Sequence, residues 1–171
     1  MTPCLDRIQA FLSAQGVHAE LEPHPQTYTA PALATVLHEK GKYVAKVFIA
    51  WADGDLAMFV LPAYDRVDLS RAQALLGCAL IRRATEDEFS HVFPDCEVGA
   101  MPPFGHLYDV PVYLDAALAR RPHLVFAAGS HHEALRMITE DYLRLVKPVV
   151  ADFVVHGPEP TPSAPAPVPF A

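Results

Sequence analysis

Two apolar runs separated by a tight turn constrain the fold of this chain more than any other feature of its sequence. The first run covers residues 43–51, the second covers residues 55–61, and Ala52-Asp53-Gly54 lies between them. An Asp-Gly pair between two apolar runs is a strong signal for an antiparallel β-hairpin. Because both runs are apolar along most of their length, we expect two central strands of a sheet.

Helical patterns and shorter strand patterns surround this hairpin. Apolar spacing and capping residues predict helices that begin at Pro3, Pro31 (residues 31–39), Leu69, Thr85 and Thr139. Short apolar stretches predict strands over residues 18–24, 79–81, 110–114 and 124–127. The segment after Ser130 fits either a capped helix or a strand over residues 135–138. The order of elements indicates an α+β fold, with a mixed, largely antiparallel sheet or partial barrel flanked by helices.

The length and composition predict one domain with an ordinary core. The chain has 171 residues, of which 51% are hydrophobic, and we place the domain at residues 1–156. Six of the fifteen residues from 157 to 171 are proline, which predicts a flexible tail. We expect a cytoplasmic protein without a membrane segment, because the sequence has no apolar stretch of about 18 residues and no signal-peptide pattern.

The three cysteines, Cys4, Cys78 and Cys96, are far apart and form no Cys-x-x-Cys motif. An odd number of widely spaced cysteines argues against a disulfide framework and against a zinc knuckle. We therefore expect free thiols.

The charge balance argues against a broad nucleic-acid surface. The chain carries 13 Lys and Arg against 20 Asp and Glu, for a net charge of −7, so any contact with nucleic acid should be small and local. The pairs Arg82-Arg83 and Arg120-Arg121 are of the kind that usually lies at solvated ends of elements. We do not predict a binding site from them.

Lys46 is the solitary charge inside the first apolar run. A buried ammonium is costly unless it is paired or faces a cleft. Lys46 therefore lies either at a sheet edge, with its stem reaching water, or at a cleft, where it meets an anionic or carbonyl-bearing ligand. Gly99 and Gly129 have a similar double interpretation, since a glycine at a strand end permits either a turn with positive φ or close approach of a ligand to the backbone.

The histidines do not predict a metal site. His131 and His132 are adjacent, so they cannot point the same way on a regular strand, and no third ligand follows at metal-like spacing. His24 lies between two prolines, which favours a loop residue over a catalytic base. We expect no metal and no cofactor.

Four motifs in this order resemble the YbaK/ProX family, whose members are stand-alone relatives of the editing domain inserted in bacterial prolyl-tRNA synthetases. The motifs are His24…Thr29-Ala30, Val44-Ala45-Lys46, Gly99-x-x-Pro102-Pro103-Phe104-Gly105, and Ala128-Gly129-Ser130-His131…Arg136-Met137. The resemblance extends from about Leu5 to Phe153.

The resemblance implies an enzyme that hydrolyses the ester between a wrong amino acid and the 3′-terminal adenosine of a tRNA. It implies small amino acids, such as Ala on tRNA-Pro, as substrates, and a tRNA synthetase as a further partner, with no role for DNA or a membrane. An aminoacyl ester is already activated, so orientation and stabilisation of the oxyanion suffice without a Ser-His-Asp triad.

The same resemblance assigns roles to individual residues. Lys46 is expected to contact the tRNA 3′ end, and the N–H groups of Gly99 and Gly129 to position the ester carbonyl. His131 is expected to bind the amino acid or to orient the attacking water or the terminal 2′-hydroxyl. The expected substrate-binding residues are Tyr28, Met101, Phe104 and Ser130, with pocket size excluding larger side chains.

Two other functions stay open at this point. The chain could be a non-catalytic tRNA- or synthetase-binding adaptor of the same fold, although an adaptor has no need to retain Lys46, Gly99, Gly129 and His131 together. It could also be an unrelated esterase that uses Cys96 or His24.

Overall fold

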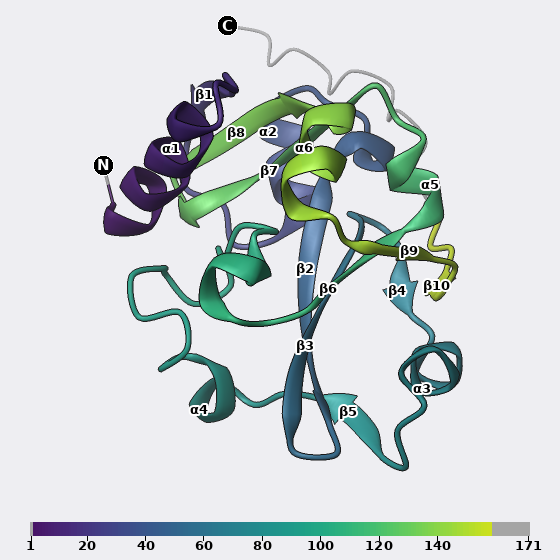
Figure 1. Ribbon diagram of the computed structural model, residues 1–171. Coiled ribbons are helices and arrows are strands. Elements are labelled where there is room, and N and C mark those ends of the chain that lie inside the picture. The colour runs from purple at the N-terminus through teal and green to yellow at the C-terminus, as the bar shows by residue number, and fades with distance from the viewer. Residues whose placement is uncertain (1, 159–171) are drawn as a thin grey trace, which may run out of the picture.

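The structure is a computed structural model that describes residues 2–158 (Figure 1). Most of the segment for which we predicted a flexible tail, from residue 159 onward, lies outside the described residues. The chain forms a five-stranded sheet, a three-stranded sheet and a small two-stranded ladder, with helices around them.

The predicted hairpin is confirmed as the centre of the five-stranded sheet. Strands β2 (Ala45–Ala52) and β3 (Asp55–Pro62) pair in antiparallel register and extend away from the three-stranded sheet (Figure 1). Asp53 and Gly54 both have positive φ, 49° and 94°, as a tight hairpin turn requires. The other strands of this sheet are β5 (Ile81–Arg83), β6 (Val112–Asp115) and β9 (Val149–Ala151), in the order β5-β2-β3-β6-β9.

The three-stranded sheet is wholly antiparallel and has the order β1-β8-β7. Its strands are β1 (Glu20–Pro23), β7 (His123–Ser130) and β8 (Glu133–Ile138), so the segment after Ser130 is a strand. An isolated bridge between Val44 and Val125 connects this sheet to the first. The small ladder pairs β4 (Arg66–Val67) with β10 (Val154–Val155). With parallel pairs only at β3–β6 and β6–β9, the predicted α+β class with a mixed, largely antiparallel arrangement is confirmed.

The helices close the core from outside. Helix α1 (Pro3–Ala14) begins at Thr2, whose hydroxyl accepts a hydrogen bond from Leu5 N–H, and buries Leu5, Ile8 and Leu12. The other helices are α2 (Ala30–Val36), α3 (Leu69–Leu76), α4 (Glu86–Phe89), α5 (Ala116–Ala119) and α6 (Thr139–Val146), with 3₁₀ turns at η1 (Gly41–Tyr43) and η2 (Gly105–Tyr108). In the described residues, no helix combines the length and the hydropathy needed to cross a membrane.

The element boundaries differ from the predicted ones at several places. Helix α2 ends at Val36 instead of residue 39, because His38 takes a positive φ of 52°. Strands β5 and β6 begin two residues later than predicted. Strand β7 continues past Ala127 through Gly129, where the pairing with β8 becomes irregular.

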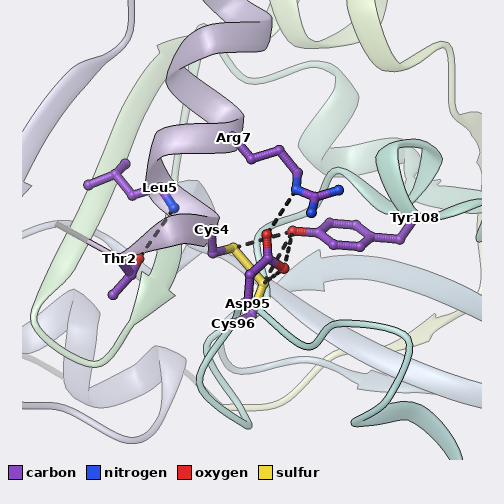
Figure 2. Close-up of a disulfide and its surroundings, with 7 residues drawn as sticks. All are labelled: Thr2, Cys4, Leu5, Arg7, Asp95, Cys96 and Tyr108. Carbon is purple, nitrogen blue, oxygen red and sulfur yellow. Dashed lines mark hydrogen bonds and ion pairs between the residues drawn. A yellow bond between two sulfur atoms is a disulfide. The ribbon is translucent and has the colours of Figure 1, made fainter.

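The expectation of three free thiols is wrong for two of the cysteines. Cys4 at the start of α1 and Cys96 in the loop after α4 form a disulfide (Figure 2), while Cys78 is free. Asp95, Tyr108 and Arg7 surround the bond, with Arg7 2.8 Å from Asp95 and Tyr108 Oη donating to Asp95 at 3.0 Å. The two cysteines are 92 residues apart in the sequence. They meet because α1 packs on β7 and the loop that follows Cys96 is bonded to the same strand, through Glu97 N–H and the Gly129 carbonyl.

Candidate active site

A cavity of about 640 Å³ opens where the first half of β2, the end of β7 and the segment from His24 to Leu33 meet. Six of the residues that we expected at the site line it: Tyr28, Lys46, Gly99, Met101, Ser130 and His131. The volume is in the range of pockets that hold ligands of the size of a drug or a nucleoside.

Lys46 lies at the unpaired part of the β2 edge. On one side β2 pairs with β3 along its full length, whereas β5 pairs only with Ala50–Ala52. The half-buried Lys46 therefore faces the cavity, and no carboxylate among residues 2–158 forms an ion pair with it. Burial lowers the pKa of its ammonium; the carboxylate of Asp65 opposes this shift, and other cations add to it.

Gly99 supplies a free backbone donor at the cavity wall. It has a φ of +86°, a conformation that favours glycine, and within the described part of the chain its N–H has no hydrogen-bond acceptor. Met101, which is 7% exposed, follows it in the cavity lining. A carbonyl oxygen of a ligand can therefore accept a hydrogen bond from Gly99.

Gly129 does not have the position that we expected for it. Its N–H donates to the carbonyl of Ala100 at 2.9 Å, and its own carbonyl accepts from Glu97 N–H at 2.9 Å. A Cβ at this position would lie 2.5 Å from Cys4 Cβ. The N–H of Gly129 is thus not available to an ester carbonyl. Gly129 instead lets β7 pass close to α1 and holds the loop that carries Gly99.

His131 is fixed by the same loop. Its backbone N–H donates to the Glu97 carboxylate at 2.9 Å, and its Nε2 lies 3.1 Å from the carbonyl of Val98. A carbonyl only accepts, so Nε2 carries a proton, and in the neutral form of the ring Nδ1 then has a lone pair. Nδ1 has no partner among residues 2–158. A neutral imidazole nitrogen of this kind can accept a proton from water or a hydroxyl.

The remaining predicted residues differ in where they lie. Tyr28 is 66% exposed and stands at the rim, with its ring centroid 4.8 Å from that of His131. Ser130 is 3% exposed and lines the cavity, but its hydroxyl donates to Glu133 at 3.2 Å. Phe104 is fully buried in the core and is not part of the cavity wall, because its ring packs against Phe126 and Tyr142.

Sequence reasoning missed several residues of the wall. His24 lies in the loop after β1, as expected, but it also lines the cavity, and its buried Nε2 has no hydrogen-bond partner among the described residues. Phe48, Arg66 and Arg83 line the cavity as well. Phe48 could have been found, because it shares a face with Lys46 in a strand. Nothing in the sequence places Arg66 or Arg83 there.

Comparisons with known proteins identify the family of this chain. The family model described as aminoacyl-tRNA editing domain matches residues 24–145, beginning at His24. The multifunctional Ser/Thr-tRNA deacylase ProXp-y of Escherichia coli (strain K12) is 25% identical over 155 residues, which are 86% of this chain and 90% of that protein.

Solved structures share the fold. One, described as a candidate trans-editing enzyme for prolyl tRNA synthetase, is 27% identical with a TM-score of 0.79, and the match covers 90% of this chain and 98% of that one. The hypothetical protein APE2540 is 20% identical with a TM-score of 0.79 over 87% of this chain and 99% of its own, a likeness of fold. Since the family model spans well over half of the sequence, the chain belongs to the aminoacyl-tRNA editing domain family, and it is a YbaK/ProX-type hydrolase of the aminoacyl-tRNA ester bond.

Proposed function

We propose that the protein is a trans-editing deacylase that removes small amino acids from mischarged tRNA, with Ala on tRNA-Pro as the first candidate substrate. The observation that carries this proposal is the cavity in which an unpaired Lys46, a free Gly99 N–H and His131 lie together. Action in trans is supported by the match to nearly the whole length of ProXp-y and of the candidate trans-editing enzyme.

Each of the three groups has its own role in the reaction. Lys46 binds the terminal nucleoside and holds the ester in place, and Gly99 N–H donates to the carbonyl oxygen as negative charge develops on it. His131 Nδ1 orients the attacking water or the terminal 2′-hydroxyl. Water adds to the carbonyl carbon, the bond from carbon to the ribose oxygen breaks, and that oxygen takes a proton. The products are the free amino acid and a tRNA with an intact 3′ terminus.

The space in the cavity at the amino-acid end of the substrate determines which side chains fit. Met101 and Ala127 present apolar surface there, and the Ser130 hydroxyl is already bonded to Glu133. A pocket of this kind excludes large side chains by volume, but it discriminates only about 100-fold against a side chain that adds a hydroxyl. Ser and Thr are therefore second candidates, in line with the substrates named for ProXp-y.

A panel of aminoacyl-tRNAs tests the proposal. Ala, Ser, Thr and Cys are each attached to tRNA-Pro and to their cognate tRNAs, and the loss of the radiolabelled ester is followed with and without enzyme. We expect rapid loss of Ala-tRNA-Pro, or of one other small mischarged species, and little loss of Pro-tRNA-Pro. Tight tRNA binding without turnover of any member would favour the adaptor alternative instead.

A Cys96→Ala variant tests the alternative in which the protein is an unrelated esterase with Cys96 as its nucleophile. Cys96 is engaged in the disulfide with Cys4, so its sulfur is not a free nucleophile in this structure. Cys4→Ala breaks the same bond but keeps the Cys96 thiol, so equal deacylase activity of Cys96→Ala and Cys4→Ala would remove cysteine chemistry from consideration.

A further inference from the structure

The cavity wall carries positive charge and no negative charge. Lys46, Arg66 and Arg83 line it, together with His24 and His131, but no Asp or Glu does. This separation stands out because the chain as a whole has 20 acidic against 13 basic residues. An electropositive cleft on an acidic protein concentrates anionic ligands at that one place.

The two arginines of the wall are free to bind an anion. Among residues 2–158, neither Arg66 nor Arg83 forms an ion pair, whereas Arg7, Arg82 and Arg136 each pair with a carboxylate at 2.9 Å or less. Both free side chains are exposed at the mouth of the cavity. A guanidinium without a carboxylate partner retains the donors that bind a phosphate in two-pronged geometry.

Arg82 and Arg83 are successive residues of β5, so their side chains point to opposite faces of the sheet. Arg82 points to the other side, donates to both carboxylate oxygens of Glu88 at 2.7 and 2.9 Å, and stacks on Trp51. Arg83 lies over the ring of Phe48, with its guanidinium carbon 4.6 Å from the ring centroid. Phe48 shares a face of β2 with Lys46, two residues away. Stacking on Phe48 therefore holds Arg83 at the same wall as Lys46.

The substrate has only one kind of group that suits this wall. An aminoacyl ester is neutral and its protonated α-amino group is cationic, so Arg66 and Arg83 repel that end. The anions of an acceptor end are its backbone phosphates. The polarity of the cavity then orients the substrate, with phosphates toward Arg66 and Arg83 and the amino acid toward Gly99 and His131.

We propose, on the basis of the proposed function, that Arg66 and Arg83 form a phosphate site for the single-stranded 3′ end of the tRNA, next to the terminal nucleoside at Lys46. The two arginines are positioning residues that determine where the ester lies. Burial is the main cause that lowers the pKa of Lys46, and the charges of Arg83 and Arg66 lower it further. A phosphate bound at the two arginines offsets their repulsion of the Lys46 ammonium.

The test compares Arg66→Ala and Arg83→Ala with Arg82→Ala. Arg82→Ala is the matched control, because it removes the same charge from the adjacent residue on the other face of β5. Each protein is assayed for kcat/KM on the preferred aminoacyl-tRNA at several salt concentrations. Binding of the trinucleotide CCA and of adenosine, which lacks phosphate, is measured in parallel.

We expect each of the two wall variants to lower kcat/KM on tRNA roughly ten-fold, mainly through KM, as the loss of a charged hydrogen bond predicts. Each variant should also reduce the slope of log kcat/KM against log salt by about 0.7. CCA binding should weaken in parallel, while adenosine binding and the Arg82→Ala control stay unchanged.

Two results would overturn the phosphate site. In one, the wall variants behave like Arg82→Ala on tRNA and on CCA. In the other, they weaken adenosine as much as CCA, which means that they disturb the cavity itself. An enzyme that hydrolyses no aminoacyl-tRNA refutes the proposed function alone, because the CCA and adenosine measurements still decide whether the arginines bind phosphate.

Discussion

Removing the Cys4–Cys96 disulfide should destabilise the fold by several kcal/mol. The bond spans a sequence separation of 92 residues, and the loop-closure entropy for a loop of that length corresponds to about 4.6 kcal/mol as an upper value. Native disulfides typically contribute about 2–4 kcal/mol. For a domain of this size the smaller figure lowers Tm by roughly 4–8 °C.

Urea unfolding measures this effect directly. The free energy of unfolding is compared for the oxidised protein, the protein kept in reductant, and the variants Cys4→Ala, Cys96→Ala and Cys4→Ala/Cys96→Ala. Because each single change removes the same bond, the double variant should lose about as much stability as either single variant, after allowance for small packing losses. The matched control is Cys78→Ala, which should respond to reductant as the wild type does.

The bond should also matter for activity. Cys96 directly precedes Glu97. The Glu97 carboxylate accepts a hydrogen bond from His131 N–H, and Glu97 N–H donates to the carbonyl of Gly129. Reduction should therefore loosen the loop that orients His131 and lower kcat more than it raises KM. Equal stability with and without reductant, or alkylation of all three cysteines in the untreated folded protein, would refute this reasoning.

Further expectations concern the two glycines and the lysine of the site. Both glycines have positive φ, but a Cβ at Gly129 meets Cys4 at 2.5 Å whereas one at Gly99 meets only His131, at 3.7 Å. Gly99→Ala should therefore cost about 1–2 kcal/mol of backbone strain, and Gly129→Ala about 1–3 kcal/mol more from overpacking; equal losses in thermal unfolding would contradict the contact. The pKa of Lys46 lies below its ordinary value of 10.5, because burial and, secondarily, Arg83 disfavour the charged form. A ¹³C NMR titration of the lysine side chains should show this lowered pKa, and Arg83→Ala should raise the pKa of Lys46. An unchanged or lower Lys46 pKa in this variant would mean that the charge of Arg83 does not act on Lys46.

The fold was predictable where local pattern decides it. The hairpin follows from an Asp-Gly turn between apolar runs, and α1 follows from Thr2-Pro3 and a stripe of apolar residues. The parallel strands β6 and β9 are short, and their pairing depends on contacts between distant segments. The disulfide was missed for the same reason, since no spacing rule connects Cys4 with Cys96.

The site was predictable in its outline through the family motifs. Lys46, Gly99, Met101 and His131 line one cavity, and their roles there stay predictions. Gly129 and Phe104 do not face it, because a motif gives the order of residues but not the direction of an N–H group or a ring. Arg83 could not be separated from Arg82 until the strand placed them on opposite faces.

The most direct test of the account is the rate at which Lys46→Ala hydrolyses the preferred mischarged tRNA, compared with Lys42→Ala. Lys42 lies in η1 outside the cavity that Lys46 lines, and its removal changes the net charge equally. We expect Lys46→Ala to lower kcat/KM about 100-fold, in the range for loss of one group that positions and stabilises the reacting ester, with unchanged Tm, while Lys42→Ala stays close to wild type. Wild-type rates in Lys46→Ala would show that the cavity described here is not where the ester is cleaved.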